Sequence, residues 1–167
     1  MLQYLILELE MVFSWLNLLA KCGFSNITGI DYSPSAIQLS KSVTKKEGLC
    51  NIELKVEDFL NLSNKVSGFH ICVDKGTFDA ISLSPDNSLG KRKQYVKSLS
   101  RVLKRKGFFL ITSCNWTKEE LLNEFSEGFE LYEELPTPKF SFGGRSGNSV
   151  AVLVLQKIQD FSLDQFS

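Results

Sequence analysis

Residues 23–40, GFSNITGIDYSPSAIQLS, contain the transition that decides the fold, from a short strand directly into a helix. Asn26–Asp31 has the length and branched residues of a strand and ends in an acid. Ser33 is a typical helix N-cap, and Pro34 fits the first helical position. The helix is expected to stop at Gly48. This stretch therefore predicts one strand–helix unit of an α/β sheet.

The rest of the chain repeats this alternation of strands and helices. An amphipathic helix is predicted at 91–103, and the capping box Thr117–Glu120 begins another. The last two strands have only a Pro/Gly-rich connection between them, so we expect them to be antiparallel. The pattern predicts an α/β fold with an open, mostly parallel, Rossmann-like sheet and helices on both faces. The further strands are predicted at Asn51–Val56, Phe69–Val73, Phe108–Thr112, Phe129–Leu135 and Val150–Leu155.

Length and charge point to a single neutral domain. The chain has 167 residues, 43% of them hydrophobic, with 19 Lys+Arg against 19 Asp+Glu. We assign residues 1–158 to one domain, with 1–20 a divergent segment, and expect 159–167 to be a flexible tail. The zero net charge argues against a nucleic-acid partner. Eight basic residues lie between Lys91 and Lys106, and we interpret them as a solvated helix face, with nucleic-acid binding as the alternative.

Other features narrow the functional classes. His70 is the only histidine, which excludes a multi-histidine zinc site, and we predict no metal. The apolar stretch Met1–Ala20 has no basic residue before Lys21 and is interrupted by Glu8 and Glu10, so we expect no membrane insertion. The four cysteines form no CxxC pair, which favours reduced thiols in an intracellular protein.

Three acids follow predicted strands at what should be one edge of the sheet. Asp31, Asp58 and Asp74 each lie just after a strand, where open α/β sheets bind ligands. A carboxylate at Asp31 can hold a ribose diol, and Asp58 can accept from an adenine amino group with Phe59 beside the ring. The alternative is that these acids only cap turns. The antiparallel end and the absence of a GxGxxG motif favour S-adenosylmethionine over a dinucleotide as the cofactor.

Five segments together resemble the class I, seven-strand methyltransferases that use S-adenosylmethionine. Within that class the chain is similar to protein-lysine methyltransferases that act on translation elongation factor 1-alpha. The likeness covers roughly residues 19–157. The segments are GFSNITGIDYSPSAIQLS (23–40), VEDFL (56–60), DKGTFDAISL (74–83), RVLKRKGFFLITSCNW (101–116) and FSFGGRSGNSV (140–150).

The resemblance implies a site and a partner. It implies that Asp74 orients the target amine or helps to accept its proton, and that Asp74 to Thr77 form the wall where the methyl group meets the lysine. Residues 140–150 would join the last two strands near the substrate mouth, as a mobile lip or a plain hairpin turn. The substrate would be elongation factor 1-alpha, and we expect a cytoplasmic protein, with the nucleus as second compartment. The implied cofactor contacts are Asp31, Tyr32, Asp58, Phe59 and Asp74.

The chain departs from the family where the first strand should lead into a glycine-rich cofactor loop. The corresponding place, Leu7–Phe13, reads LELEMVF and contains no glycine. Apolar residues from 2 to 19 recur at spacings of three and four, which predicts one amphipathic helix. Glu8 or Glu10 would then be the candidate partner for the cofactor's ammonium group, and we expect the family's upstream segment to be absent. The second functional hypothesis is therefore a catalytically inactive methyltransferase-like binding module.

Overall fold

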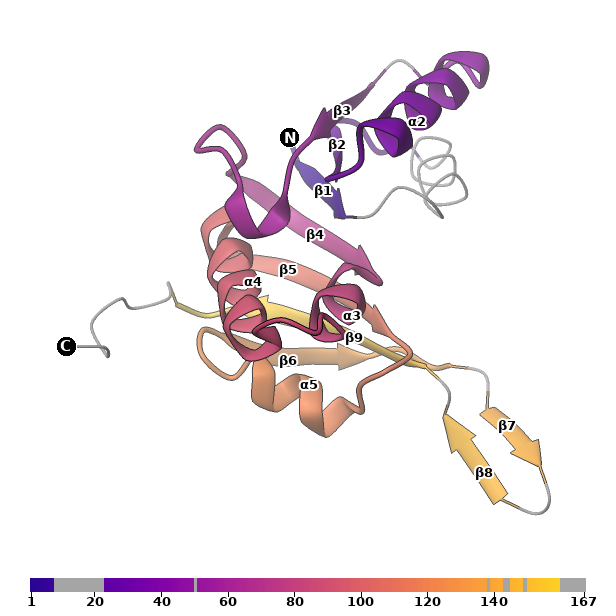
Figure 1. The fold of residues 1–167 in the computed structure, drawn as a ribbon, viewed down its shortest axis with the longest axis vertical. Helices are drawn as coiled ribbons and strands as arrows, with labels where there is room; N and C mark the ends of the chain where they lie inside the picture. The colour runs from indigo at the N-terminus through magenta and orange to yellow at the C-terminus, as the bar shows by residue number, and fades with distance from the viewer. Residues whose placement is uncertain (8–22, 50, 138, 143–144, 149, 160–167) are drawn as a thin grey trace.

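The structure, a computed structural model, describes residues 1–7, 23–49, 51–137, 139–142, 145–148 and 150–159. These residues form a seven-stranded sheet and a separate two-stranded hairpin (Figure 1). The strands are β1 Tyr4–Leu7, β2 Ile27–Asp31, β3 Ile52–Val56, β4 Phe69–Lys75, β5 Leu103–Ser113, β6 Phe129–Glu134, β7 Lys139–Phe142, β8 Arg145–Asn148 and β9 Ala151–Lys157. The helices are α2 Pro34–Lys46, α3 Thr77–Ser82, α4 Ser88–Val102 and α5 Lys118–Glu124, with a 3-10 turn, η1, at Phe59–Asn61.

The sheet has the mixed topology that the sequence predicts. Its strand order is β3-β2-β1-β4-β5-β9-β6, and the first five strands in this order are parallel. β9 runs antiparallel to both of its neighbours, β5 and β6. The predicted fold class, an open Rossmann-like sheet with a C-terminal antiparallel pair, is confirmed. Parallel strands end at the same edge, so the carboxyl ends of β1 to β5 meet there.

Helices cover both faces of the sheet, and the side chains of β1 show how. Leu5 and Leu7 belong to the larger core cluster, with buried residues of α3, α4 and α5. Tyr4 and Ile6 point to the opposite face and join a smaller cluster that includes Ile37 of α2. This alternation is the two-residue period of a strand. A strand with two buried faces can be apolar at every position.

The position of β1 corrects the helix predicted over residues 2–19. Tyr4, Ile6 and Leu7 lie off the predicted apolar stripe, yet they are 6%, 2% and 1% exposed, while Leu2 on the stripe is 51% exposed. Parallel pairing with β2 on one side and β4 on the other stabilises the strand. Because a central strand carries apolar residues throughout, it also satisfies a helical spacing. The remainder of the predicted helix lies outside the described residues.

The end of α4 lies close to its predicted place. The helix stops at Val102, one residue before the predicted end, and the basic residues 104–106 lie in the exposed start of β5. The ammonium group of Lys157, on β9, donates to the carbonyls of Ser100 at 2.5 Å and Leu103 at 3.0 Å. A buried cation from a distant strand thus satisfies the terminal carbonyls of the helix.

Two predictions concern the C-terminal half, namely the capping box at the start of α5 and the segment between β6 and β9. Thr117 and Glu120 form the predicted reciprocal capping box at the start of α5. The segment that joins β6 to β9 contains the antiparallel hairpin β7–β8, which extends away from the body of the sheet (Figure 1). The described part of this segment thus forms a hairpin, and its function as a lip at the substrate mouth stays a prediction. None of the described helices is both long and apolar enough to cross a membrane.

Candidate functional site

A crevice opens at the carboxyl edge of the sheet, above the ends of β1, β2 and β3. Its volume is about 250 Å³. One wall comes from the strand ends and the turns that follow them, and the other comes from α3. Its polar groups are concentrated at the ends of β2 and β3. The lining residues are Leu7, Ile30, Asp31, Tyr32, Ser33, Glu57, Asp58, Phe59, Leu60, Thr77, Ala80 and Ile81.

Asp31 and Tyr32 form the β2 side of the crevice. Asp31 ends β2 and is only 8% exposed, and one of its carboxylate oxygens accepts from the backbone N–H of Ser33 at 2.8 Å. Ser33 in turn caps α2 by accepting from the N–H of Ala36. This turn holds the Asp31 side chain at the crevice, and a carboxylate has lone pairs for further donors. Tyr32 is 80% exposed and stands at the rim.

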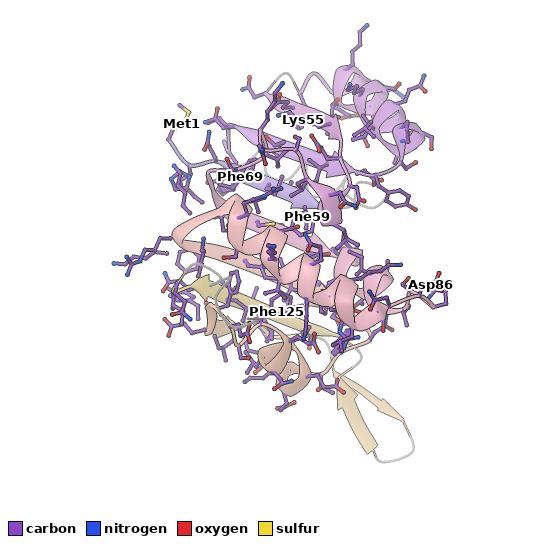
Figure 2. The ribbon with its side chains drawn as sticks, turned by 60° about the vertical axis from the view of Figure 1, so that its left-hand side comes forward. Met1, Lys55, Phe59, Phe69, Asp86 and Phe125 are labelled. Carbon is purple, nitrogen blue, oxygen red and sulfur yellow. The ribbon has the colours of Figure 1, made fainter. Side chains whose placement is uncertain are left out.

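Asp58 and Phe59 form the β3 side. The Asp58 carboxylate caps η1, accepting from Leu60 N–H and from the Asn61 side-chain amide, both at 2.9 Å. Asp58 can therefore cap a turn and also accept a hydrogen bond from an adenine amino group, because the two bonds leave acceptor sites on its oxygens. Phe59, labelled in Figure 2, is almost fully buried. Its ring packs against that of Tyr95 of α4, with ring centroids 4.7 Å apart. It supplies an apolar wall that the core fixes in place.

Asp74 lies behind the crevice and is not among the lining residues. Its side chain is 0% exposed, and one oxygen accepts from Thr77 N–H at 2.8 Å. The other accepts from Phe78 N–H at 3.0 Å and from the Tyr95 hydroxyl. Gly76, which lies between Asp74 and Thr77, has a φ of 117°. This backbone conformation favours glycine and lets β4 turn directly into α3. Burial raises the pKa of Asp74 to about 6, against the lowering effect of these three donors.

The structure therefore brings four of the five predicted site residues to one crevice and puts the fifth beneath its wall. Thr77 lines the crevice, as expected for the end of the wall that the resemblance implied, but α3 itself was not predicted and contributes Ala80 and Ile81. The only sequence signal that could have indicated α3 was the motif DKGTFDA, residues 74–80. His70 lies near the start of β4, at the opposite end from Asp74. Among the described residues, no group of three His, Cys, Asp or Glu is placed to hold a metal ion.

A second groove lies at the same edge, beyond the end of β5 and the start of β9. Its volume is about 460 Å³. The Lys118 ammonium contacts the Glu134 carboxylate at 2.6 Å across α5 and β6, and this contact raises the pKa of Lys118. The lining residues are Cys114, Asn115, Trp116, Thr117, Lys118, Glu119, Glu134, Leu135, Thr137, Val150, Ala151 and Val152.

Some basic side chains of the segment 91–106 make contacts within the fold. Arg92 pairs with Glu124 at 3.0 Å and lies 5.2 Å above the Trp116 ring. Arg101 donates to the carbonyl of Leu62 at 2.9 Å. These contacts attach α4 to its neighbours, and they reduce the charge available for a nucleic acid.

A ligand crevice at the carboxyl edge of a mostly parallel sheet that closes with an antiparallel strand defines a Rossmann-like, cofactor-binding α/β domain. The sequence matches the family described as "Methyltransferase domain" over residues 14–159, and the chain belongs to this family. The matched range includes β2 to β9 and the three acids Asp31, Asp58 and Asp74.

Similar proteins agree with this assignment. The chain is 86% identical over 140 residues to EEF1A lysine methyltransferase 2 of Homo sapiens, covering 84% of this chain and 59% of that protein. It is 58% identical over 139 residues to the protein of the same name from Danio rerio, covering 83% and 60%. The chain thus spans about three fifths of the length of these relatives. A SAM-dependent methyltransferase of Methanosarcina mazei shares the fold, with a TM-score of 0.73, 20% identity, and coverage of 95% of this chain and 93% of that one.

Proposed function

We propose that this chain carries the core of an S-adenosylmethionine-dependent protein-lysine N-methyltransferase that acts on translation elongation factor 1-alpha. The names of three relatives support this proposal. The human and zebrafish relatives are named EEF1A lysine methyltransferase 2, and a fission-yeast relative, 37% identical over 135 residues, is named a protein-lysine N-methyltransferase. We also propose a cytoplasmic location, with the nucleus as second compartment.

The observation that carries the proposal is the crevice with Asp31 and Asp58 at adjacent strand ends. A ribose diol needs a carboxylate that can accept from two hydroxyls, and Asp31 offers one that is nearly buried and fixed by its turn. An adenine ring needs apolar walls and an acceptor for its amino group, which Phe59, Ile81 and Asp58 provide. The described lining thus fits the nucleoside part of S-adenosylmethionine. Residues 8–22, where the glycine-free LELEMVF segment continues, lie outside the described residues.

S-adenosylmethionine supplies a methyl group that is already activated on a sulfonium. The protein then has to present a neutral lysine amine, whose free pKa is about 10.4, and desolvation at a closed site favours that neutral form. Alignment of the two groups is the main catalytic task. We propose that Asp74 contributes to this alignment as a positioning residue, because its two oxygens accept from Thr77 N–H and Phe78 N–H and so hold the turn at the start of α3. A direct contact of Asp74 with the amine stays a prediction.

Calorimetry with S-adenosylmethionine tests the cofactor site. We expect binding by the wild-type chain and a loss of about 10- to 100-fold in affinity for Asp31→Asn, the equivalent of one charge-assisted hydrogen bond. Asp86→Asn is the matched control, because Asp86 is exposed in the connection between α3 and α4 and lies outside the crevice lining (Figure 2). Transfer of a labelled methyl group to elongation factor 1-alpha then tests the reaction.

The competing hypothesis, an inactive binding module, makes a different prediction for the same experiments. An inactive module gives no heat at millimolar cofactor but still captures elongation factor 1-alpha. That pair of results would overturn the proposed enzyme. Its motivation is the sequence of 7–13, where the family's close-approaching glycines are replaced by larger side chains.

A further inference from the structure

Asp79 joins α3 to the end of β5 through a hydrogen-bond network. One carboxylate oxygen accepts from the Ser113 hydroxyl at 2.5 Å, and the other accepts from Cys114 N–H at 2.9 Å. The same Ser113 oxygen accepts from the N–H groups of Asn115 at 3.1 Å and Trp116 at 3.0 Å. Ser113 is 1% exposed. The carboxylate and one buried hydroxyl thus organise the turn at 113–116.

This network lies between the two cavities of the carboxyl edge. On one side, Thr77, Ala80 and Ile81 of α3 line the crevice proposed for the cofactor. On the other side, residues 114–118 line the second groove. Asp79 is the neighbour of Ala80 in α3, and its bonds end on the first residues of the turn that borders the groove. Movement of one wall relative to the other must therefore stretch these bonds.

Contacts other than those of Asp79 also hold α3 on the core. The Phe78 ring already packs against Tyr95 and Phe125, with ring centroids 5.1 Å apart in both pairs. Asp74 caps the first turn of the helix. The bonds of Asp79 act instead on the turn after β5. Their loss should therefore change the groove more than the crevice.

We propose that Asp79 is a positioning residue that fixes the 114–118 wall of the second groove relative to the cofactor crevice, and so seats the protein substrate against the methyl donor. This inference rests on the proposed function. It identifies the second groove as part of the substrate side of the site, and it gives each cavity its own readout. Cofactor affinity reports on the crevice, and affinity for elongation factor 1-alpha reports on the groove.

The test uses Asp79→Asn and Ser113→Ala, with Ser82→Ala as the control. Ser82 is in α3 as well, but its hydroxyl donates only locally, to the carbonyl of Phe78 at 2.7 Å. Asn at 79 keeps the size of the side chain, but its amide cannot accept from both Ser113 and Cys114. We expect Asp79→Asn to weaken binding of elongation factor 1-alpha about 5- to 20-fold, as for one to two lost hydrogen bonds. Cofactor affinity should stay within about twofold, and the control should change neither.

A second readout does not depend on catalysis. Cys114 is exposed and free, so its rate of alkylation by N-ethylmaleimide, followed by mass spectrometry of the modified peptide, reports the order of the turn. We expect this rate to rise severalfold in Asp79→Asn and in Ser113→Ala. The double variant should be no more affected than Asp79→Asn alone, because both substitutions break one network.

Three results would overturn the inference. The first is equal loss of cofactor and protein affinity, which would indicate a general structural role. The second is an unchanged Cys114 rate together with unchanged protein affinity. The third is simple addition of the two substitutions in the double variant. If the wild-type chain neither methylates nor binds elongation factor 1-alpha, the proposed function fails, and a raised Cys114 rate would still show that Asp79 orders the turn.

Discussion

Replacing Asp74 with Asn isolates the energetic cost of a buried carboxylate. Asp74 is fully buried beside Cys72, and three donors from Thr77, Phe78 and Tyr95 point at its two oxygens. Burial raises its pKa from 3.8 to about 6, and the nearby Asp79 adds to the rise, so in this site the loss of hydration outweighs the three hydrogen bonds. Asn keeps the shape of the side chain and removes its titration.

The shift sets both the sign and the size of the effect. The folded chain holds the Asp74 proton more tightly than the unfolded chain does. The resulting stabilisation is complete below a pH of about 4 and is lost as the pH rises through about 6. A rise from 3.8 to about 6 corresponds to about 3 kcal/mol, roughly half of which falls between pH 5 and 8. Relative to Asp74→Asn, the wild type should therefore lose stability as the pH increases over this range.

Urea unfolding of both proteins at several pH values between 5 and 8 measures this difference. Groups that titrate alike in both proteins cancel in the difference, and Asp86→Asn, at an exposed position, is the control substitution. A difference that does not change with pH would refute the reasoning. So would a wild type that gains stability relative to Asp74→Asn as the pH rises, because the donors from Thr77, Phe78 and Tyr95 would then outweigh burial.

Two further substitutions test local features of the fold by chemical unfolding. Lys157→Met should lower the free energy of unfolding by about 2 kcal/mol, because the carbonyls of Ser100 and Leu103 lose a charged donor in a buried place. A more stable Lys157→Met protein would show that the free-energy cost of dehydrating the ammonium group exceeds the stabilisation from its two hydrogen bonds. Thr117→Ala should cost about 1 kcal/mol by removing the acceptor for Glu120 N–H at the start of α5. An unchanged midpoint would mean that the capping box adds nothing to the stability of the folded chain.

Much of the fold is predictable because its units are local. The N-cap at Ser33, the capping box at Thr117 and the apolar stripe of α4 each depend on residues within a few positions of one another. The strand β1 is different. Its sequence, YLIL, is apolar at every position, and only its pairing with β2 and β4 makes it a strand. A short apolar run without alternation carries no signal that separates strand from helix.

The same distinction applies to the site. Asp31 and Asp58 were predictable because each lies at or just beyond the end of a strand, and parallel strands bring their ends together. The contacts of Asp79 with Ser113 and of Asp74 with Tyr95 join residues 34 and 21 positions apart. Such contacts depend on how helices pack on the sheet. The sequence therefore predicted the acids that line the crevice more easily than the contacts of the acids that hold its walls.

The register of β1 connects the one misassigned segment to the crevice itself. Leu7, the last residue of this strand, pairs with Ile30 of β2 on one side and with Asp74 of β4 on the other. Leu7 and Ile30 line the crevice, and Asp74 lies under its opposite wall. A helix over residues 2–7 would leave β2 and β4 without the strand between them, and the two walls would have no common floor. The crevice proposed for the cofactor therefore depends on four residues that become a strand only through the partners on either side.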